Sequence, residues 1–407
     1  MLAPYRSVLA TPGAKRFTAA GLLARTPIST MTLGIVLLVE HLSGSYGFAG
    51  TVSAAYMGGA AAASPVLGRF IDRFGQRRVL LPAFAGFASG LLAMMVSLEL
   101  GWPSLATYAA AAVGGIAYPP VGSCIRARWS SALSGPALHT AFSLEAMVDE
   151  MLFILGPVLV TVLAVQVDPS VALLAVLVVA VVGGGLLSGL RATEPPVSTA
   201  SSLGHRSERL PWGWLSLLMS AAACLGSLFG ATEVATVAFA AEHGQPQVTG
   251  VLLAIWAAGS LIAGFITGAF SWSASAGQRY RWGASGMAVA MAPLPFIDSV
   301  ALMGVVLFFG GFAISPTMIA SISLIEAKVP AERLTEGLTL VTTGIAFGIA
   351  PGAATAGWMI DALGASRGFY VSVISGVLAA LLAWLTLAGR EIPSVPRALD
   401  RQVAGAP

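Results

Sequence analysis

Long apolar runs recur along the whole chain, and they restrict its fold more than any other feature of the sequence. An α-helix needs about 20 apolar residues to cross the ~30 Å hydrocarbon layer of a bilayer, and the runs reach this length. Backbone groups inside a bilayer must form their hydrogen bonds within the protein, which leaves helices or a closed barrel. The strands of a membrane barrel have only about 10 residues of alternating hydrophobicity, so the runs predict helices.

We therefore expect an all-α membrane protein with twelve transmembrane helices. The predicted ranges are 18–41, 48–67, 79–98, 104–125, 138–166, 170–190, 212–241, 248–272, 282–297, 299–325, 336–360 and 366–389. The ninth and tenth ranges nearly meet at Asp298. Hydrophobic residues make up 57% of the 407 residues and charged residues 10%, whereas a soluble domain has about 25% charged residues. This composition excludes an ordinary soluble protein.

The distribution of positive charges predicts the orientation of the chain. Nineteen of the 21 Lys and Arg residues fall in the termini or in loops on the same side of the membrane as the termini. Because positively charged loops stay in the cytoplasm, we expect both termini there, in a multi-pass protein of the cytoplasmic (inner) membrane. The excess of Arg over Lys favours a bacterial source. Topology accounts for the net charge of +3, so we expect no nucleic-acid partner.

The sequence divides into two similar halves. Residues 192–211 form its longest polar segment, rich in Pro, Ser and Thr, with six predicted spans on either side. We expect a six-helix bundle in 1–191, a cytoplasmic linker in 192–211, and a second bundle with a short cytoplasmic tail in 212–407. GGIAYPP at 114–120 and GGFAISP at 310–316 occupy equivalent positions in the two halves. A parallel repeat of this kind predicts a site near the membrane midplane between the halves.

The loop between the second and third spans carries a motif. It reads GRFIDRFGQRR and contains Gly68, Arg69, Asp72, Arg73, Gly75, Arg77 and Arg78. The loop resembles the signature G-x-x-x-D-R-x-G-R/K-R/K of the major facilitator superfamily, except that Gln76 stands at the first closing position. With the twelve spans, the repeat and the linker, the resemblance covers nearly the whole chain. It implies a secondary transporter that works by alternating access, and not an enzyme.

The resemblance also implies that this loop is a cytoplasmic latch, whose arginines tie the two halves together when the transporter opens outward. Gly68 would permit a close approach of helices and Gly75 a turn. Asp72 would accept hydrogen bonds from arginines or cap the N-terminus of a neighbouring helix. The alternative is that the basic residues only set the topology.

Charged residues inside the predicted spans indicate a functional site, because each costs several kcal/mol in a membrane. The acids are Glu145, Asp149 and Glu150 in the fifth span and Glu233 in the seventh, and Arg25 in the first span is the cation. At 1.5 Å per residue, Arg25 and Glu145 both lie about 10 Å from the cytoplasmic ends of their helices, so they can pair. Asp149, one turn further along, can take the arginine instead.

We expect Asp149 or Glu150 to exchange a proton during transport, with one of the two facing a central cavity. Burial raises the pKa of a carboxyl group and a nearby arginine lowers it, so an acid that is alternately wet and dry can load and release protons near neutral pH. The alternative is a static charge pair that locks the first span to the fifth. Glu233 is a candidate to bind a cationic group of the substrate or to form a structural hydrogen bond.

Gly156 and Pro157 follow these acids and predict a bend, because proline removes a backbone donor. The pair resembles part of the antiporter motif of drug–proton exporters, which continues with further glycines where this chain has Leu159 and Val160. The glycines of the eleventh span, Gly344, Gly348 and Gly352, predict a packing stripe. The remaining candidates for a substrate cavity are aromatic: Tyr56, Tyr118, Phe229, Trp256 and Phe347.

These features together predict a monomeric, proton-coupled exporter of a small amphipathic molecule, embedded in a lipid bilayer. Uptake of a small metabolite by proton symport is the alternative. The two cysteines lie in separate spans and the four histidines stand at no metal-ligand spacing, so we expect no metal and no cofactor. An intramembrane enzyme would need a nucleophile or a metal motif, and the sequence has neither.

Overall fold

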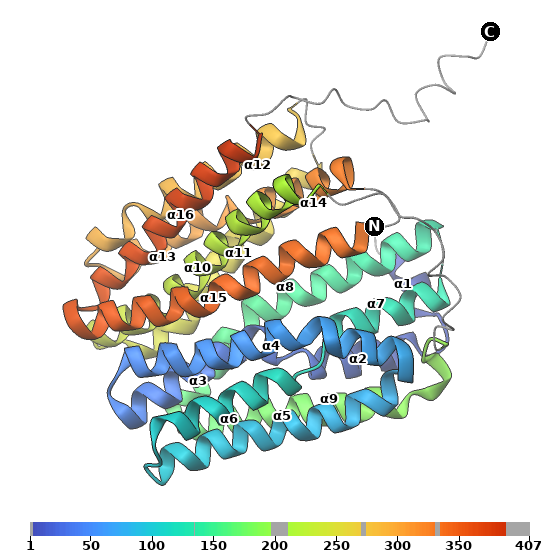
Figure 1. Cartoon of the computed structure of the whole chain (residues 1–407), viewed down its shortest axis with the longest axis horizontal. Helices are drawn as coiled ribbons and strands as arrows, with labels where there is room; N and C mark the ends of the chain where they lie inside the picture. Colours follow the sequence, from blue (N-terminus) through green and yellow to red (C-terminus); the bar gives the residue numbers. More distant parts are fainter. Residues whose placement is uncertain (1–2, 134, 197–210, 270–273, 330–333, 388–407) are drawn as a thin grey trace.

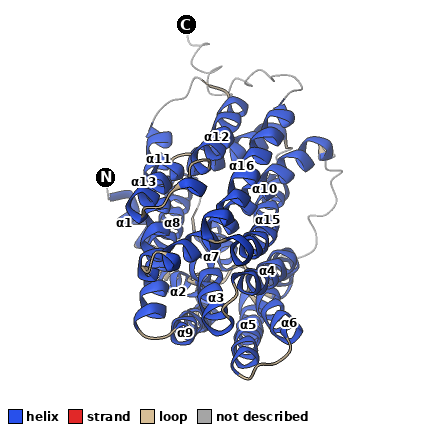
Figure 2. Cartoon of the chain, turned by 90° about the vertical axis from the view of Figure 1, so that its left-hand side faces the viewer, coloured by secondary structure: helices blue, strands red, loops and turns tan. Residues whose placement is uncertain are grey.

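The computed structural model describes residues 3–133, 135–196, 211–269, 274–329 and 334–387. Nearly all of these residues are helical, and these ranges contain no β-strand (Figure 2). The predicted all-α fold class is confirmed.

The helices from the first half of the sequence lie together in the lower part of Figure 1, coloured blue to green. They are α1 (Ala3–Leu9), α2 (Ala14–Ala24), α3 (Pro27–Ser43), α4 (Tyr46–Phe74), α5 (Gln76–Glu99), α6 (Ser104–Ala117), α7 (Val121–Ala132), α8 (Gly135–Gln166) and α9 (Pro169–Gly189), followed by the 3₁₀ turn η1 (Arg191–Thr193).

The helices that follow occupy the upper part of Figure 1. They are α10 (Trp212–Glu242), α11 (Thr249–Ala269), α12 (Ala276–Met291), α13 (Val300–Gly311), α14 (Ile314–Lys328), α15 (Leu334–Leu363) and α16 (Ala365–Leu387), with the 3₁₀ turns η2 (Pro246–Val248) and η3 (Leu294–Phe296). Packing between α4 and α15 and between α8 and α11 joins the two groups.

Within the described ranges, nine segments are long and apolar enough to cross a membrane, and each falls on a predicted span. The other three predicted spans, 48–67, 104–125 and 282–297, fall on α4, on α6 with α7, and on α12. Large apolar side chains are exposed on many of these helices, for example on α9, α13 and α16, as expected for surfaces that face lipid.

Three predicted spans are interrupted. The first breaks between α2 and α3, the fourth between α6 and α7, and the tenth between α13 and α14. Proline has no amide N–H, which accounts for the breaks before Pro27 and at Pro119 and Pro120. The breaks in the fourth and tenth spans fall within GGIAYPP and GGFAISP. The two similar sequence segments therefore share the same structural feature, an interrupted helix.

Glycines allow α10 and α15 to pack closely. A Cβ atom at Gly344, Gly348 or Gly352 of α15 would meet a backbone carbonyl of α10. The packing stripe predicted for the eleventh span is therefore confirmed.

α4 and α15 are joined by hydrogen bonds at the end of the structure where the α3–α4 and α15–α16 turns lie. Asp361 near the end of α15 accepts hydrogen bonds from Ser45 Oγ at 2.6 Å and from the amides of Tyr46 and Gly47 at 2.8 Å each. A carboxylate at these orphan amides also interacts favourably with the helix dipole. Asp361 thus caps the N-terminus of α4 from a helix that lies more than half the chain away.

The predicted latch loop lies at the opposite end, between α4 and α5. Gly75 has a φ of 89°, so the expected turn is confirmed. No helix approaches Gly68 closely in this conformation, because a Cβ atom there would have nothing within 4 Å, so its role in the latch stays a prediction. In the described part of the chain the exposed side chains of Arg69, Asp72 and Arg78 have no hydrogen-bond or ion-pair partner.

The other residues of this loop serve the local fold. The Arg77 amide donates to Glu194 at 3.0 Å, and the Arg73 guanidinium lies over the ring of Phe74. Gln76, which departs from the family signature, is buried: it donates to the Cys124 carbonyl at 2.9 Å and accepts from Arg128 at 2.7 Å.

A larger residue in the glycine stripe of α15 should destabilise the protein. Replacing Gly348 with Ala puts a methyl group against the α10 backbone and should lower the free energy of unfolding by about 1–3 kcal/mol, the usual cost of overpacking. Gly185→Ala in α9 is the matched control, because nothing lies within 4 Å of its Cβ position. Denaturant unfolding of both variants in detergent measures the difference. Equal stability of the two variants would contradict the packing role.

Candidate functional site

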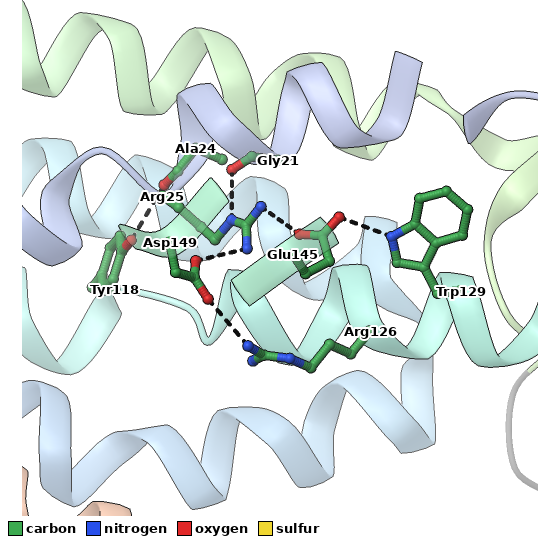
Figure 3. Close-up of polar contacts among 8 residues, drawn as sticks. All are labelled: Gly21, Ala24, Arg25, Tyr118, Arg126, Trp129, Glu145 and Asp149. Carbon is green, nitrogen blue, oxygen red and sulfur yellow. Dashed lines mark hydrogen bonds and ion pairs between the residues drawn. The ribbon is translucent and has the colours of Figure 1, made fainter. Parts of the chain in front are cut away.

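The Arg25 guanidinium lies between two carboxylates, inside the protein (Figure 3). Its Nη2 is 2.6 Å from Glu145 Oε2 and its Nη1 is 2.9 Å from Asp149 Oδ1. The side chains of Arg25 and Glu145 are 2% and 0% exposed, so this part of the cluster is sealed from solvent. The sequence left open which acid takes the arginine, and the structure shows that both do.

The break between α2 and α3 positions Arg25 in this cluster. Its backbone ends α2, and its Nε donates to the Gly21 carbonyl at 3.2 Å. The freed carbonyl of Ala24 accepts a hydrogen bond from the Tyr118 hydroxyl at 3.2 Å. Backbone groups released by a break at membrane depth require such internal partners.

Two further residues complete the cluster, and the sequence analysis did not predict them. Arg126 of α7 donates to Asp149 at 3.1 Å, and the indole N–H of Trp129 donates to Glu145 at 2.8 Å. The Arg126 side chain is 46% exposed, so the cluster reaches water on that side. The sequence did place Arg126 at the cytoplasmic end of the fourth predicted span. Its position along the chain could not show that its side chain pairs with Asp149 on another helix.

A cavity of about 470 Å³ lies between helices of the two sequence halves. α3, α4 and α8 contribute Ile28, Ser29, Thr32, Leu33, Met57, Glu150, Phe153 and Pro157, and α10, α11, α14 and α15 contribute Phe229, Gly230, Glu233, Leu253, Trp256, Ala257, Ser260, Ile314, Met318, Ile345 and Ile349. Apolar walls with a few polar groups are typical of small-molecule sites, as is this volume.

The face of α8 determines which of its acids reaches the cavity. Glu150, Phe153 and Pro157 follow the i, i+3, i+7 spacing of one helix face and all line the cavity. Glu145 and Asp149 lie on the neighbouring face, toward Arg25. The structure thus separates two adjacent acids, Asp149 in the ion cluster and Glu150 in the cavity.

The Gly156–Pro157 pair lies where α8 meets its neighbours. A Cβ atom at Gly156 would meet Ser29 Oγ of α3, and one at Gly250 of α11 would meet the Pro157 carbonyl. Pro157 lies inside the continuous helix α8. The predicted bend there stays a prediction.

Neither cavity acid is neutralised by a cation. Among the described residues Glu150 has no hydrogen-bond or ion-pair partner. Glu233 interacts with Thr32, across the two halves, while its buried Oε1 has no partner in this part of the chain. The lining contains no Lys, Arg or His within the described ranges.

The aromatic candidates divide between the cavity and other places. Phe229 and Trp256 line the cavity. The structure places Tyr56 and Tyr118 elsewhere, packed around Phe87 inside the first half of the chain. Phe347 is 50% exposed and points away, because it lies about 200° around α15 from the lining residue Ile345.

Arg25 should contribute much more to the stability of the protein than Arg126. Arg25→Met should lower the free energy of unfolding by about 3–5 kcal/mol, because it leaves Glu145 charged, buried and without its cation. Arg126→Met removes a half-exposed member of the same cluster and should cost about 1 kcal/mol or less. Denaturant unfolding in detergent measures both variants. A loss at Arg126→Met as large as that at Arg25→Met would contradict the structural role assigned to Arg25.

Comparison with known proteins identifies what this arrangement resembles. A sequence model described as Major Facilitator Superfamily matches residues 18–309. No curated protein sequence matches the chain.

Solved structures share the fold at low sequence identity. The nucleoside transporter NupG is 14% identical with a TM-score of 0.68, covering 92% of this chain and 98% of its own. The inward-open xylose transporter XylE from E. coli is 16% identical with a TM-score of 0.67, covering 98% and 99%. An inward-facing bacterial homologue of the iron transporter ferroportin is 17% identical with a TM-score of 0.67, covering 92% and 99%. At these identities the likeness concerns the fold alone.

Proposed function

Because this chain belongs to the Major Facilitator Superfamily of membrane transporters, we propose that it is a secondary active transporter that exports a small amphipathic molecule in exchange for protons. One observation carries the proposal: a cavity of about 470 Å³ between the two halves holds Glu150 and Glu233 without a cationic partner in the described lining. Two such acids in an apolar cavity supply a place for a proton and a place for a polar substrate group.

The proposed working unit is a monomer of two bundles, 1–191 and 212–407, joined by the linker 192–211. Much of this linker, 197–210, lies outside the described residues. We assign both termini to the cytoplasmic side of a bacterial inner membrane, on the asymmetry of Lys and Arg. The end joined by Asp361 is then the outer end, and we infer that it is closed and that the protein is in an inward-facing state.

The latch loop fits this state. Its Asp72 and Arg69 are exposed and unpaired in the described part of the chain, as expected if the cytoplasmic contacts form only when the protein opens outward. In the inward-facing state, Asp361 binds α4 on the outer side and the latch is open. In the outward-facing state, the Asp361 contact is broken and the latch binds its partners on the cytoplasmic side.

We assign the proton to Glu150. Asp149 is neutralised by Arg25 and Arg126, so its charge is already balanced in this state. Glu150 faces the cavity and has no such cation, so protonation is its route to neutrality when the cavity loses water. Arg25, Glu145 and Asp149 form the static lock between the first and fifth spans in this account.

The export direction rests on the apolar lining and on the partial Gly156–Pro157 motif. In energised cells that express the protein, we expect a panel of cationic, neutral and anionic amphipathic dyes to include at least one that is depleted, and a protonophore to abolish the depletion. Accumulation of the dye would indicate the symport alternative.

Glu150→Gln should abolish this proton-driven efflux while leaving the protein folded, because a glutamine keeps the shape of the side chain and cannot release a proton. Asp168→Asn, in the turn before α9, is the control and should transport like the unmodified protein. Dye efflux from cells and from proteoliposomes under an imposed pH gradient gives the readout. Full proton-driven efflux by the Glu150→Gln variant would exclude Glu150 as the proton carrier.

A further inference from the structure

We propose that Glu233, Phe229 and Trp256 form a cation-binding subsite, and that the substrate is a lipophilic organic cation. This inference rests on the proposed function and adds to it the chemical class of the substrate.

The charge balance of the membrane-embedded residues leaves the cavity acidic. Arg25 and Arg126 are both bound to carboxylates of the ion cluster, at distances from 2.6 to 3.1 Å. Neither contributes to the cavity lining, which contains Glu150 and Glu233 and no basic residue within the described ranges. An uncompensated carboxylate in such surroundings attracts a positive charge strongly, because the low dielectric screens it little.

Glu233 has an open position for a ligand. Its Oε1 is buried and lacks a partner in the described part of the chain, although the side chain as a whole lines the cavity. A buried acceptor without a partner is costly, so a donor or cation that pairs with it gains a favourable interaction. A cationic group in the cavity would supply the missing interaction.

Two aromatic rings line the same cavity as this carboxylate. Phe229 is one helical turn before Glu233 on α10, and Trp256 on α11 packs edge to face against Phe229 with ring centroids 5.6 Å apart. The faces of Trp and Phe attract cations through the ring quadrupole, most strongly when water is excluded. A carboxylate with two rings is therefore suited to an onium group with an apolar body.

The rest of the lining argues against other substrate classes. An organic anion would meet two carboxylates and no cation among the described lining residues. A sugar would need many hydrogen-bond partners, whereas most of the wall is Ile, Leu, Met, Phe, Pro and Ala. The volume of about 470 Å³ suits a drug-sized molecule.

The two cavity acids then have different tasks. Glu150 on α8 carries the proton, and Glu233 on α10 carries the cation, so each half of the chain contributes one carboxylate. Exchange of one proton for one monovalent cation would leave the charge of the cavity unchanged over the cycle.

Binding of two ions of matched size tests the inference. Tetraphenylphosphonium and tetraphenylborate have the same shape and apolar surface but opposite charges. We expect the purified full-length protein to bind tetraphenylphosphonium in equilibrium dialysis and to bind tetraphenylborate at least ~10-fold more weakly, a difference of about 1.4 kcal/mol. Equal or tighter binding of the borate would overturn the cation assignment.

Binding by single-residue variants tests whether the cation binds at Glu233 and Trp256. Glu233→Gln keeps the shape of the side chain and should weaken tetraphenylphosphonium binding about 10-fold or more. Trp256→Leu should weaken it about 3-fold or more, in line with the loss of a cation–π contact. Glu99→Gln, at the end of α5, is the control and should bind like the unmodified protein. Unmodified affinity in a Glu233→Gln variant that unfolds at the normal temperature would overturn the subsite.

The binding experiments and the efflux experiments can fail independently of each other. Proton-driven efflux of a neutral or anionic dye, with no binding of tetraphenylphosphonium, would overturn the cation subsite and leave the transporter proposal intact. Binding of tetraphenylphosphonium at Glu233 without proton-driven efflux of any dye would support the subsite and overturn the proposed exchange.

Discussion

The ion cluster around Arg25 holds the broken first span against α8. A guanidinium enclosed at membrane depth requires negative partners, and Glu145 and Asp149 supply them at 2.6 and 2.9 Å. This pairing ties the break between α2 and α3 to α8, and Arg126 and Trp129 extend it to α7. It also fixes the rotation of α8 about its axis. Glu150, about 100° from Asp149 on the helix, is thereby turned toward the cavity.

The same constraint divides the membrane-embedded charges into two groups. Arg25 and Arg126 balance the charges of Glu145 and Asp149, so this cluster needs no further ion in this state. Glu150 and Glu233 have no cation within the described lining, so they are neutral only when a proton or a cationic ligand is present. At one end of the structure, Asp361 of α15 caps α4 and joins the two sequence halves. In the proposed transport cycle this contact opens while another closes at the opposite end.

The sequence was sufficient for the fold class and for the residues that carry charge, because length, hydropathy and charge are local properties. It did not show that the first, fourth and tenth spans are interrupted, although Pro27, Pro119 and Pro120 indicate two of the breaks. Partners such as Arg126 and Trp129 depend on how helices pack, which spacing along one helix cannot reveal. For the same reason, aromatic type alone did not separate Phe229 and Trp256 from Tyr56, Tyr118 and Phe347.

Distances measured at both ends of the protein at once test whether it works by alternating access. Spin labels at Leu42 and Leu363, near the turns beside Asp361, report on the closed end, and labels at Ser131 and Trp282 report on the end with the latch loop. Pulsed electron resonance distances in lipid, recorded across a range of pH and with tetraphenylphosphonium, should change in opposite directions at the two ends. Distances that stay fixed at both ends, or that lengthen together, would contradict alternating access around the cavity.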